Sequence, residues 1–411
     1  MKRRALDIQK DLPAIRRIWE EIGWLDRDEE DQAKYLSTFL HASHALVAEI
    51  NDNAECMVAT TKGSLQHLDS VLSLSIVASV TTSLIARKQG FASRLTAELV
   101  AKAALSGAEL SALGMFEQGY YSRLGFGTGP YEHRVQFDPA QLSVSSKARI
   151  PQRLTTDDYK DVHFALSNRW ASHGSVNVFA AEHAHAEMGW TDDAFGLGYR
   201  NDDGELTHFI WGENKGEHGP LTINALAYQN SEQLLELLSM LKGLSDQIYT
   251  VSILEPSHLQ MQDLINSPFR RQTTTEGSEH EEGNYAEAFW QIRINNLEAV
   301  LEKTQLPGRP ELSFNLELSD PIVDFLSEQS AWQGIAGNYS ITLGEKCCAS
   351  TGHQRGLPLL KASVGGFSRL WLGCASATAI ALSGEISADR ALLDSIEKSL
   401  CLPLPKTGWE F

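Results

Sequence analysis

The most constraining feature of the sequence is an apolar run that leads through a glycine-containing turn into a helix. Residues 71–82 (VLSLSIVASVTT) are rich in apolar and β-branched residues, which predicts a buried strand. A helix is predicted from about Gly90 to Leu105, and Gly107 is positioned to end it. A strand that feeds a helix in this way is typical of layered proteins in which helices cover a sheet.

The same junction predicts a binding site for an anionic group. The first N–H groups of a helix have no partner within the helix, and the helix dipole places partial positive charge there. A pyrophosphate fits such an end. Gly90 lets a ligand approach the backbone, Ala92 and Ser93 are small, and Arg87 and Lys88 can pair with outlying phosphates. The alternative is that Arg87 and Lys88 are ordinary solvated charges.

A second motif follows the helix. Residues 110–115 (LSALGM) predict another strand, and residues 118–124 predict a short helix that contains Tyr121. The motif reads Tyr121-Ser-Arg-Leu-Gly125-Phe126. Upstream, residues 44–61 predict a hairpin that turns at Asn51-Asp52-Asn53. Further upstream, Asp11-Leu12-Pro13 predicts a helix start with Asp11 as the cap.

These two motifs resemble those of the GNAT acetyltransferases. Arg87-x-x-Gly90-x-Ala92 resembles the family's coenzyme A signature, and Tyr121-x-x-x-Gly125-Phe126 resembles the tyrosine motif that follows it. The order and spacing of the two motifs match the family, which makes the pair more specific than either one alone. Phe116, which precedes Tyr121, departs from the smaller residue expected to line the cofactor site, and Lys88 stands where an arginine is usual.

A chain of 411 residues is too long for one core, and residues 137–154 lose periodicity and gain Ser and Pro, which predicts a linker. A second α/β segment without the phosphate signature follows, and residues 289–303 (FWQIRINNLEAVLEK) lead to a tail region. This organisation resembles the enhanced intracellular survival (Eis) family. The resemblance implies an α/β (α+β) fold with two tandem GNAT-like domains, each with a mixed central sheet, and a sterol carrier protein-like α+β domain. The expected boundaries are 1–145 for the domain with the coenzyme A site, 146–293 for a degenerate second GNAT-like domain, and 294–411 for the third.

The resemblance also implies a direct transfer from acetyl-coenzyme A to an amine. Tyr121 is the expected general acid, and the α-carboxylate of the last residue, Phe411, is the expected base. Asp26 and Glu410 are expected near the acceptor. The expected cofactor-binding residues are Val80, Thr81, Thr82, Arg87, Lys88, Gln89, Gly90, Phe91 and Ala92.

Elementary chemistry is consistent with these roles. Acyl transfer from a thioester requires an amine that loses a proton, a stabilised oxyanion and a protonated leaving sulfur. A tyrosine, with a pKa of about 10, is protonated at pH 7. An α-carboxylate, with a pKa of about 3.3–3.7, is a weak base unless burial or nearby negative charge raises its pKa. The alternatives are that Tyr121 is a core aromatic and that Phe411 is a frayed terminus.

Composition restricts the partners. The formal net charge of −18 disfavours nucleic acid and anionic membranes and favours cationic acceptors, such as aminoglycosides or lysine side chains. The acidic residues between Asp26 and Asp31 fit an acceptor pocket or a solvated face equally well. Five cysteines without a C-x-x-C pair predict reduced thiols and a cytoplasmic location. We expect no metal, and the Eis resemblance implies a homo-oligomer, with a hexamer as one form.

Two further segments allow other interpretations. On a strand, the alternation of His183, His185 and Glu187 would place them on one face, as metal ligands are placed, but no second cluster completes a site, which favours a surface position. Residues 370–382 (LWLGCASATAIAL) would line an apolar cavity if the chain were instead a lipid-binding protein with a non-catalytic GNAT scaffold.

Overall fold

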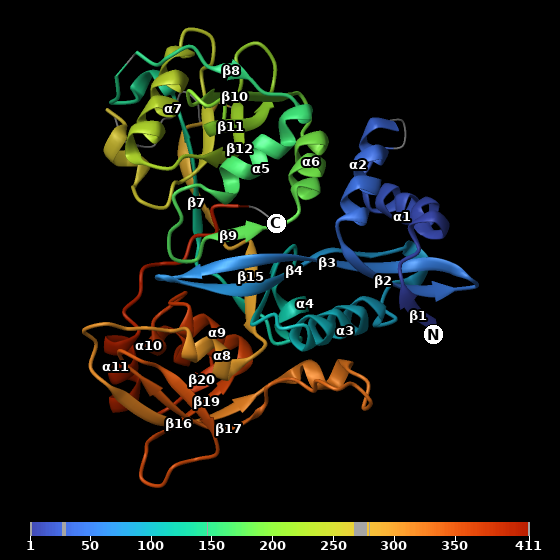
Figure 1. The fold of residues 1–411 in the computed structure, drawn as a ribbon, viewed down its shortest axis with the longest axis vertical. Coiled ribbons are helices and arrows are strands. Elements are labelled where there is room, and N and C mark those ends of the chain that lie inside the picture. The colour runs from blue at the N-terminus through green and yellow to red at the C-terminus, as the bar shows by residue number, and fades with distance from the viewer. Residues whose placement is uncertain (1, 27–29, 146, 267–277, 279, 410–411) are drawn as a thin grey trace.

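The structure, a computed structural model, describes residues 2–26, 30–145, 147–266, 278 and 280–409. Its strands form three sheets, and helices pack against each of them (Figure 1). The predicted mixed α/β class is confirmed. None of the helices described is long and apolar enough to cross a bilayer.

The first sheet carries the two sequence motifs. Its strand order is β1-β2-β3-β4-β5-β15-β6, and β9 pairs with β3. Helices α1 and α2 cover one face, and α3 and α4 cover the other (Figure 1). The bounds are β1 (Lys2–Ala5), β2 (His44–Ile50), β3 (Asn53–His67), β4 (Ser70–Thr82), β5 (Leu110–Gly114), β6 (Gly127–Thr128), β9 (Val176–Val178), β15 (Trp290–Ile294), α1 (Ile8–Ile22), α2 (Glu30–His41), α3 (Phe91–Leu105) and α4 (Gln118–Ser122).

The first helix begins earlier than predicted. Asp7, rather than Asp11, is the N-cap of α1, and its carboxylate accepts hydrogen bonds from the backbone N–H groups of Gln9 and Lys10. Asp11 instead accepts two hydrogen bonds from Arg4, at 2.6 and 2.7 Å. The prediction was wrong because it took Asp11, the acidic residue nearest to Pro13, as the cap. In the structure, Arg4 of β1 binds the Asp11 carboxylate instead.

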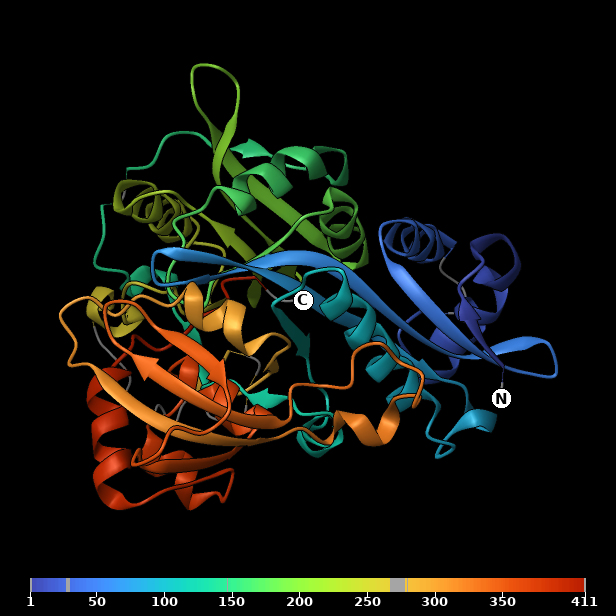
Figure 2. The same ribbon diagram turned by 60° about the horizontal axis from the view of Figure 1, so that its bottom comes forward.

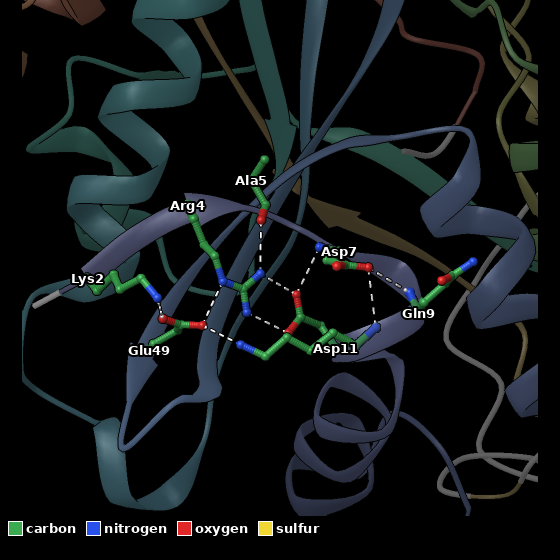
Figure 3. Close-up of polar contacts among 8 residues, drawn as sticks. Lys2, Arg4, Ala5, Asp7, Gln9, Asp11 and Glu49 are labelled. Carbon is green, nitrogen blue, oxygen red and sulfur yellow. Dashed lines mark hydrogen bonds and ion pairs between the residues drawn. The ribbon is translucent and has the colours of Figure 1, made fainter.

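An ion-pair network ties the edge strand β1 to the sheet and to α1 (Figure 3). Arg4 binds both Asp11 and Glu49, and its Nε lies 2.6 Å from a Glu49 oxygen. Lys10 and Lys2 also reach the Glu49 carboxylate, at 2.8 and 2.9 Å. Hydrogen bonds from Lys10, Lys2 and Arg4 lower the pKa of Glu49 from 4.5 to about 2. The basic N-terminal segment is therefore used within the fold.

This network predicts a pH dependence of stability. Since folding lowers the pKa of Glu49 from 4.5 to about 2, the ionised carboxylate stabilises the fold fully above about pH 4.5, and this contribution is lost as the pH falls toward 2. In urea denaturation, Glu49→Gln should lower the free energy of unfolding more at pH 6 than at pH 3.5. Glu317→Gln, which breaks an exposed pair with Lys361, is the control and should change stability by less than about 1 kcal/mol. An equal Glu49→Gln effect at both pH values would contradict the prediction.

The second sheet repeats the plan of the first. Its order is β14-β7-β13-β12-β11-β10-β8, and β12 and β13 form a parallel pair, as β4 and β5 do. Helix α7 connects β12 to β13. The bounds are β7 (Glu132–Phe137), β8 (Gln152–Arg153), β10 (Ala194–Arg200), β11 (Leu206–Asn214), β12 (Leu221–Ala227), β13 (Val251–Leu254), β14 (Gly283–Glu287), α5 (Tyr159–Ser167), α6 (Ala181–Trp190) and α7 (Ser231–Gly243).

The sheets do not follow the expected boundaries strand by strand. β7, from the segment expected in the first domain, lies in the second sheet. β15, which ends at the expected start of the third domain, lies in the first sheet between β5 and β6. The first two parts of the chain are therefore joined by strands as well as by a linker.

The segment with His183, His185 and Glu187 is helix α6, not a strand. His183 is buried and meets Phe39 edge to face, at 4.8 Å between ring centroids, so the expected surface position is wrong for this residue. His185 stacks on Tyr159 at 4.2 Å. In the part of the chain that the structure describes, no group of three or more His, Cys, Asp or Glu residues could hold a metal ion.

The third sheet has the order β18-β17-β16-β19-β20, and its core continues into the first sheet. Trp290 and Ile292 of β15 belong to the same buried cluster as Phe314, Val364 and Trp371. Buried residues of the 370–382 segment pack into this shared core. The bounds are β16 (Leu312–Ser319), β17 (Gly337–Leu343), β18 (Cys348–Thr351), β19 (Leu359–Ser363), β20 (Ile386–Ser387), α8 (Leu297–Glu302), α9 (Val364–Trp371), α10 (Ala377–Leu382) and α11 (Arg390–Ser399).

Short 3₁₀ turns complete the described elements. One of them, η5 (Pro321–Phe325), belongs to a segment, residues 320–335, that extends from the third sheet along α3; Figures 1 and 2 show it in orange beside that helix. The other turns are η1 (Leu84–Ala86), η2 (Pro139–Gln141), η3 (Thr156–Asp158) and η4 (Met261–Leu264).

Candidate active site

Strands β4 and β5 diverge next to the first motif. Their parallel pairing runs from Leu74–Leu110 to Val77–Leu113; β5 then ends at Gly114, while β4 continues to Thr82. Against β3, the register shifts so that β4 contains an extra residue, and Ser79 has a φ of 50°. A bulge of this kind bends a strand away from its neighbour. An extended ligand can therefore pair with the backbone of β4 beyond Val77.

Helix α3 presents an uncapped N-terminus to this divergence. Its N-cap is Gly90, which has a φ of 73° and, having no side chain, leaves the first N–H groups without a side-chain cap. Arg87, Lys88, Gln89 and Gly90 are exposed. The structure thus brings the predicted cation pair and the helix N-terminus together on an open surface.

The corresponding helix of the second sheet lacks this feature. Asn230 caps α7 by accepting a hydrogen bond from the N–H of Gln233, and Glu232 places a negative charge in the first turn. An anion would displace the cap and meet a carboxylate there. Of these two helices, α3 alone has an N-terminus without a side-chain cap.

Tyr121 lies on α4, buried to 2% exposure beside the N-terminal part of α3. Its ring meets Tyr120 at 4.9 Å and Phe116 at 6.0 Å, both edge to face. Burial raises the pKa of the Tyr121 phenol well above its usual value, so the hydroxyl is protonated throughout the neutral range. Such a group can donate a proton but is not a base.

Phe116 lies at the surface. It is 74% exposed and stands beside Tyr121, in the turn between β5 and α4. The ring is available to a ligand that lies along the divergence.

The sequence analysis missed Arg123. Its guanidinium lies 4.5 Å from the Tyr120 ring centroid, and its Nη2 donates to Ser93 Oγ at 2.8 Å. Ser93 Oγ in turn donates to the Tyr120 hydroxyl at 3.1 Å. A third cation therefore lies near the start of α3. Its position within the motif, two residues after Tyr121, was the available signal.

Residues from distant parts of the chain hold the turn that follows Tyr121. Arg293 on β15 donates from Nη1 to the Leu124 carbonyl at 2.5 Å and pairs through Nη2 with Asp320 at 2.7 Å. Both side chains of this pair are fully buried. Gly125 lies directly against them: a Cβ there would come within 2.5 Å of Val364 Cγ1, 2.9 Å of Arg293 Nη1 and 3.1 Å of Asp320 Oδ1. The glycine of the motif is therefore required by packing.

The C-terminal segment enters the middle of the molecule between the first two sheets (Figure 1). The Thr407 carbonyl accepts from the backbone N–H of Val176 at 2.9 Å and from Arg169 Nη2 at 3.0 Å. Lys406 reaches Glu255 at 3.3 Å, and Trp409 packs against the cores on both sides. Residues 410–411, which contain the predicted site residues Glu410 and Phe411, lie outside the described residues.

A cavity of about 300 Å³ lies beside this segment, in the divergence of β12 and β13 rather than that of β4 and β5. Its wall mixes aromatic and charged side chains, including Glu132, Trp170, Tyr228, Glu255, Lys406 and Trp409. Asp26 is exposed in the connection between α1 and α2, where its backbone N–H donates to Gln32 Oε1 at 3.3 Å.

Comparison with known proteins identifies the first part of the chain. Residues 4–129 match the family model described as an acetyltransferase (GNAT) domain. This part of the chain is a GNAT acetyltransferase domain. The protein is accordingly an enzyme of the acetyltransferase class, as the paired motifs predicted. No curated protein matches the chain.

Solved structures match along the whole chain. A conserved protein of unknown function from Enterococcus faecalis V583, described as a probable N-acyltransferase, has a TM-score of 0.80 at 15% identity and covers 100% of this chain and 99% of its own. Eis1 from Mycobacterium abscessus has a TM-score of 0.76 at 14% identity, with 100% of both chains covered. A GCN5-related N-acetyltransferase from Anabaena variabilis gives 0.76 at 15% identity, again over 100% of both chains. At these identities the likeness shows the fold.

The packing around Gly125 gives a prediction for the GNAT domain. Ala at a positive φ costs about 1–2 kcal/mol, and this cost applies both to Gly125, at φ 82°, and to Gly107, at φ 92°. Only Gly125→Ala must also displace neighbouring atoms, because nothing lies within 4 Å of a Cβ at Gly107. In urea denaturation Gly125→Ala should lose about 1–3 kcal/mol more than Gly107→Ala. Equal losses would mean that the third region does not press on this turn.

Proposed function

We propose that this protein transfers the acetyl group of acetyl-coenzyme A to a primary amine of a polycationic small molecule or a lysine side chain. The observation that carries the proposal is the direct succession of three features: the divergence of β4 from β5, the uncapped N-terminus of α3, and buried Tyr121 beside that helix. A thioester with a long arm and a pyrophosphate matches this succession.

The donor would lie along β4. Backbone groups of Val80, Thr81 and Thr82 would pair with the pantetheine arm, because β5 no longer occupies that edge of β4. The pyrophosphate would bind the N–H groups of α3 around Gln89, Gly90, Phe91 and Ala92. Arg87 and Lys88 would pair with the phosphate charges.

The reaction then needs one acid and one base. The amine nitrogen attacks the thioester carbon, the C–N bond forms, and the C–S bond breaks. Tyr121, whose burial keeps it protonated, donates a proton to the departing sulfur. The α-carboxylate of Phe411 accepts the proton that the amine loses.

The placement of the C-terminal segment supports the role given to Phe411. The backbone at Thr407 is fixed by hydrogen bonds from Val176 and Arg169, so the last residues start from a defined point between the first two sheets. Four residues follow Thr407, and they span at most about 14 Å. Glu410, together with the cavity wall that contains Glu132 and Glu255, would supply negative charge for a cationic acceptor, and Asp26 would do so from the α1–α2 connection.

We further infer a homo-oligomer, with a hexamer as one form, that works in the cytoplasm on a soluble amine, without nucleic acid or membrane. We also infer that the third region is a sterol carrier-like domain.

The first test is the release of coenzyme A from acetyl-coenzyme A with a panel of amines: an aminoglycoside, a polyamine, a lysine peptide and an arylamine. We expect release with a polycationic or lysine acceptor, and we expect Tyr121→Phe to lower kcat by about 10²–10⁴-fold, because the acid is lost while the ring remains. Tyr120→Phe, which changes the neighbouring hydroxyl, is the matched control and should have a smaller effect. Full activity of Tyr121→Phe would remove this acid from the mechanism.

The second test moves the terminal carboxylate. Appending Gly-Ser after Phe411 keeps every native side chain but displaces the α-carboxylate, so kcat should fall by about 10²-fold or more if this group is the base. The same dipeptide added before Met1 serves as the control. Unchanged activity of the C-terminal extension would exclude Phe411 as the base and leave the donor site unaffected.

A further inference from the structure

We propose that the buried Arg293–Asp320 ion pair is a positioning device for Tyr121 and thereby makes the third region necessary for the chemical step. This inference rests on the proposed function, because it assigns the pair to the acid of that reaction. Neither side chain is exposed, and Arg293 contacts the turn after Tyr121, so the pair would act through Tyr121 and not on the donor directly.

The guanidinium of Arg293 uses all three of its nitrogens. Nη2 binds Asp320 Oδ2 at 2.7 Å, Nε donates to Asn295 Oδ1 at 3.2 Å, and Nη1 donates to the Leu124 carbonyl at 2.5 Å. These three hydrogen bonds fix the planar guanidinium in a single orientation. β15 holds the residue from behind, because it pairs with both β5 and β6.

The turn held by Arg293 is bonded back to Tyr121. The N–H of Leu124 donates to the Tyr121 carbonyl at 2.9 Å, and the N–H of Phe126 donates to the same oxygen at 3.3 Å. One peptide segment therefore separates the guanidinium from the backbone of Tyr121. A shift of Arg293 would move Leu124 and, through these bonds, the phenol.

Asp320 extends the link into the third region. Its carboxylate also accepts from the N–H groups of Ile322, at 3.2 Å, and Ile335, at 3.0 Å, so it ties together both ends of segment 320–335. Ile322 is fully buried in the same cluster as Tyr121 and Phe126. The segment thus packs Ile322 against the aromatic cluster, while the ion pair fixes the turn.

A double-mutant cycle tests the inference in the full-length protein. Arg293→Lys keeps the charge but loses the fork, and Asp320→Asn keeps an acceptor but loses the charge. Each should lower kcat about 10–100-fold, because displacements near 1 Å can cost about 10²-fold, with KM for acetyl-coenzyme A changed less than about twofold. In a Tyr121→Phe background neither should lower kcat further, since both would act through the missing hydroxyl. The inference would be overturned if the kcat losses multiplied when either substitution is combined with Tyr121→Phe, or if only KM rose.

A matched control separates positioning from general stability. Glu109 is buried, and its carboxylate pairs with Lys303, the C-cap of α8, at 2.7 Å and accepts from the N–H of Ser73. This pair also joins the first sheet to a neighbouring element, and both of these contacts lie away from the turn after Tyr121 in the sequence. Glu109→Gln should lower the thermal midpoint and leave kcat unchanged when assayed below that midpoint. A fall in kcat equal to that of Arg293→Lys would identify a stability effect and overturn the inference.

If Asp320→Asn does not fold, Ile322→Ala takes its place in the double-mutant cycle together with Arg293→Lys. Ile322→Ala removes packing of the same segment against the cluster and leaves the ion pair intact. If Tyr121→Phe alone keeps full activity, the proposed acid fails; a kcat loss in Arg293→Lys would then overturn the coupling to Tyr121 without bearing on the donor site.

Discussion

The Arg293–Asp320 pair is the interaction on which the arrangement of the first and third regions depends. Taking two charges out of water costs several kcal/mol for each ion, and only close geometry with further hydrogen bonds recovers that cost. Here Arg293 also binds Leu124 and Asn295, and Asp320 also binds two backbone N–H groups. Moving the first and third regions apart would separate these two groups and leave each as a buried unpaired charge. The pair therefore holds the two regions in one relative position.

Glycines allow the close approach that this pair requires. The run from Gly125 to Gly129 imitates a dinucleotide-binding motif in sequence, but its glycines serve packing. A Cβ at Gly127 would overlap Gly365 and Arg369 of α9, and one at Gly129 would overlap the Trp290 ring. The strand β6 can therefore lie directly against α9 and β15. The third region is packed directly against the segment that follows Tyr121 and is not a tethered tail.

The two sheets of the first parts of the chain share a plan but differ in chemistry. Both contain a parallel pair that diverges, at β4–β5 and at β12–β13. Gly90 leaves α3 open to an anion, whereas Asn230 closes α7 with its own side chain. The C-terminal segment, through Trp409, borders the cavity at the second divergence. The repeated fold thus leaves an open helix N-terminus beside the first divergence, whereas the C-terminal segment borders the second.

The sequence by itself determined the local features. The apolar run before Gly90, the hairpin at Asn51-Asp52-Asn53 and the helix that carries Tyr121 depend on neighbouring residues, so periodicity and turn chemistry predicted them. The alternation of His183, His185 and Glu187 would place them on one face only if the segment were a strand, but the segment is helix α6, which packs against α2. Likewise, Asp11 pairs with Arg4 of β1, and Asp7 rather than Asp11 caps α1.

Only the tertiary structure decided how the site is supported. Leu124, Arg293 and Asp320 are far apart in the sequence, and neither propensity nor spacing relates them. Their contact arises because β15 inserts between β5 and β6 and because segment 320–335 extends back along α3. The residues of the proposed donor site are local in sequence, since a helix N-terminus and a strand edge are local structures. The groups that hold those residues still are distant in sequence, because a buried charge needs a partner that only folding can bring to it.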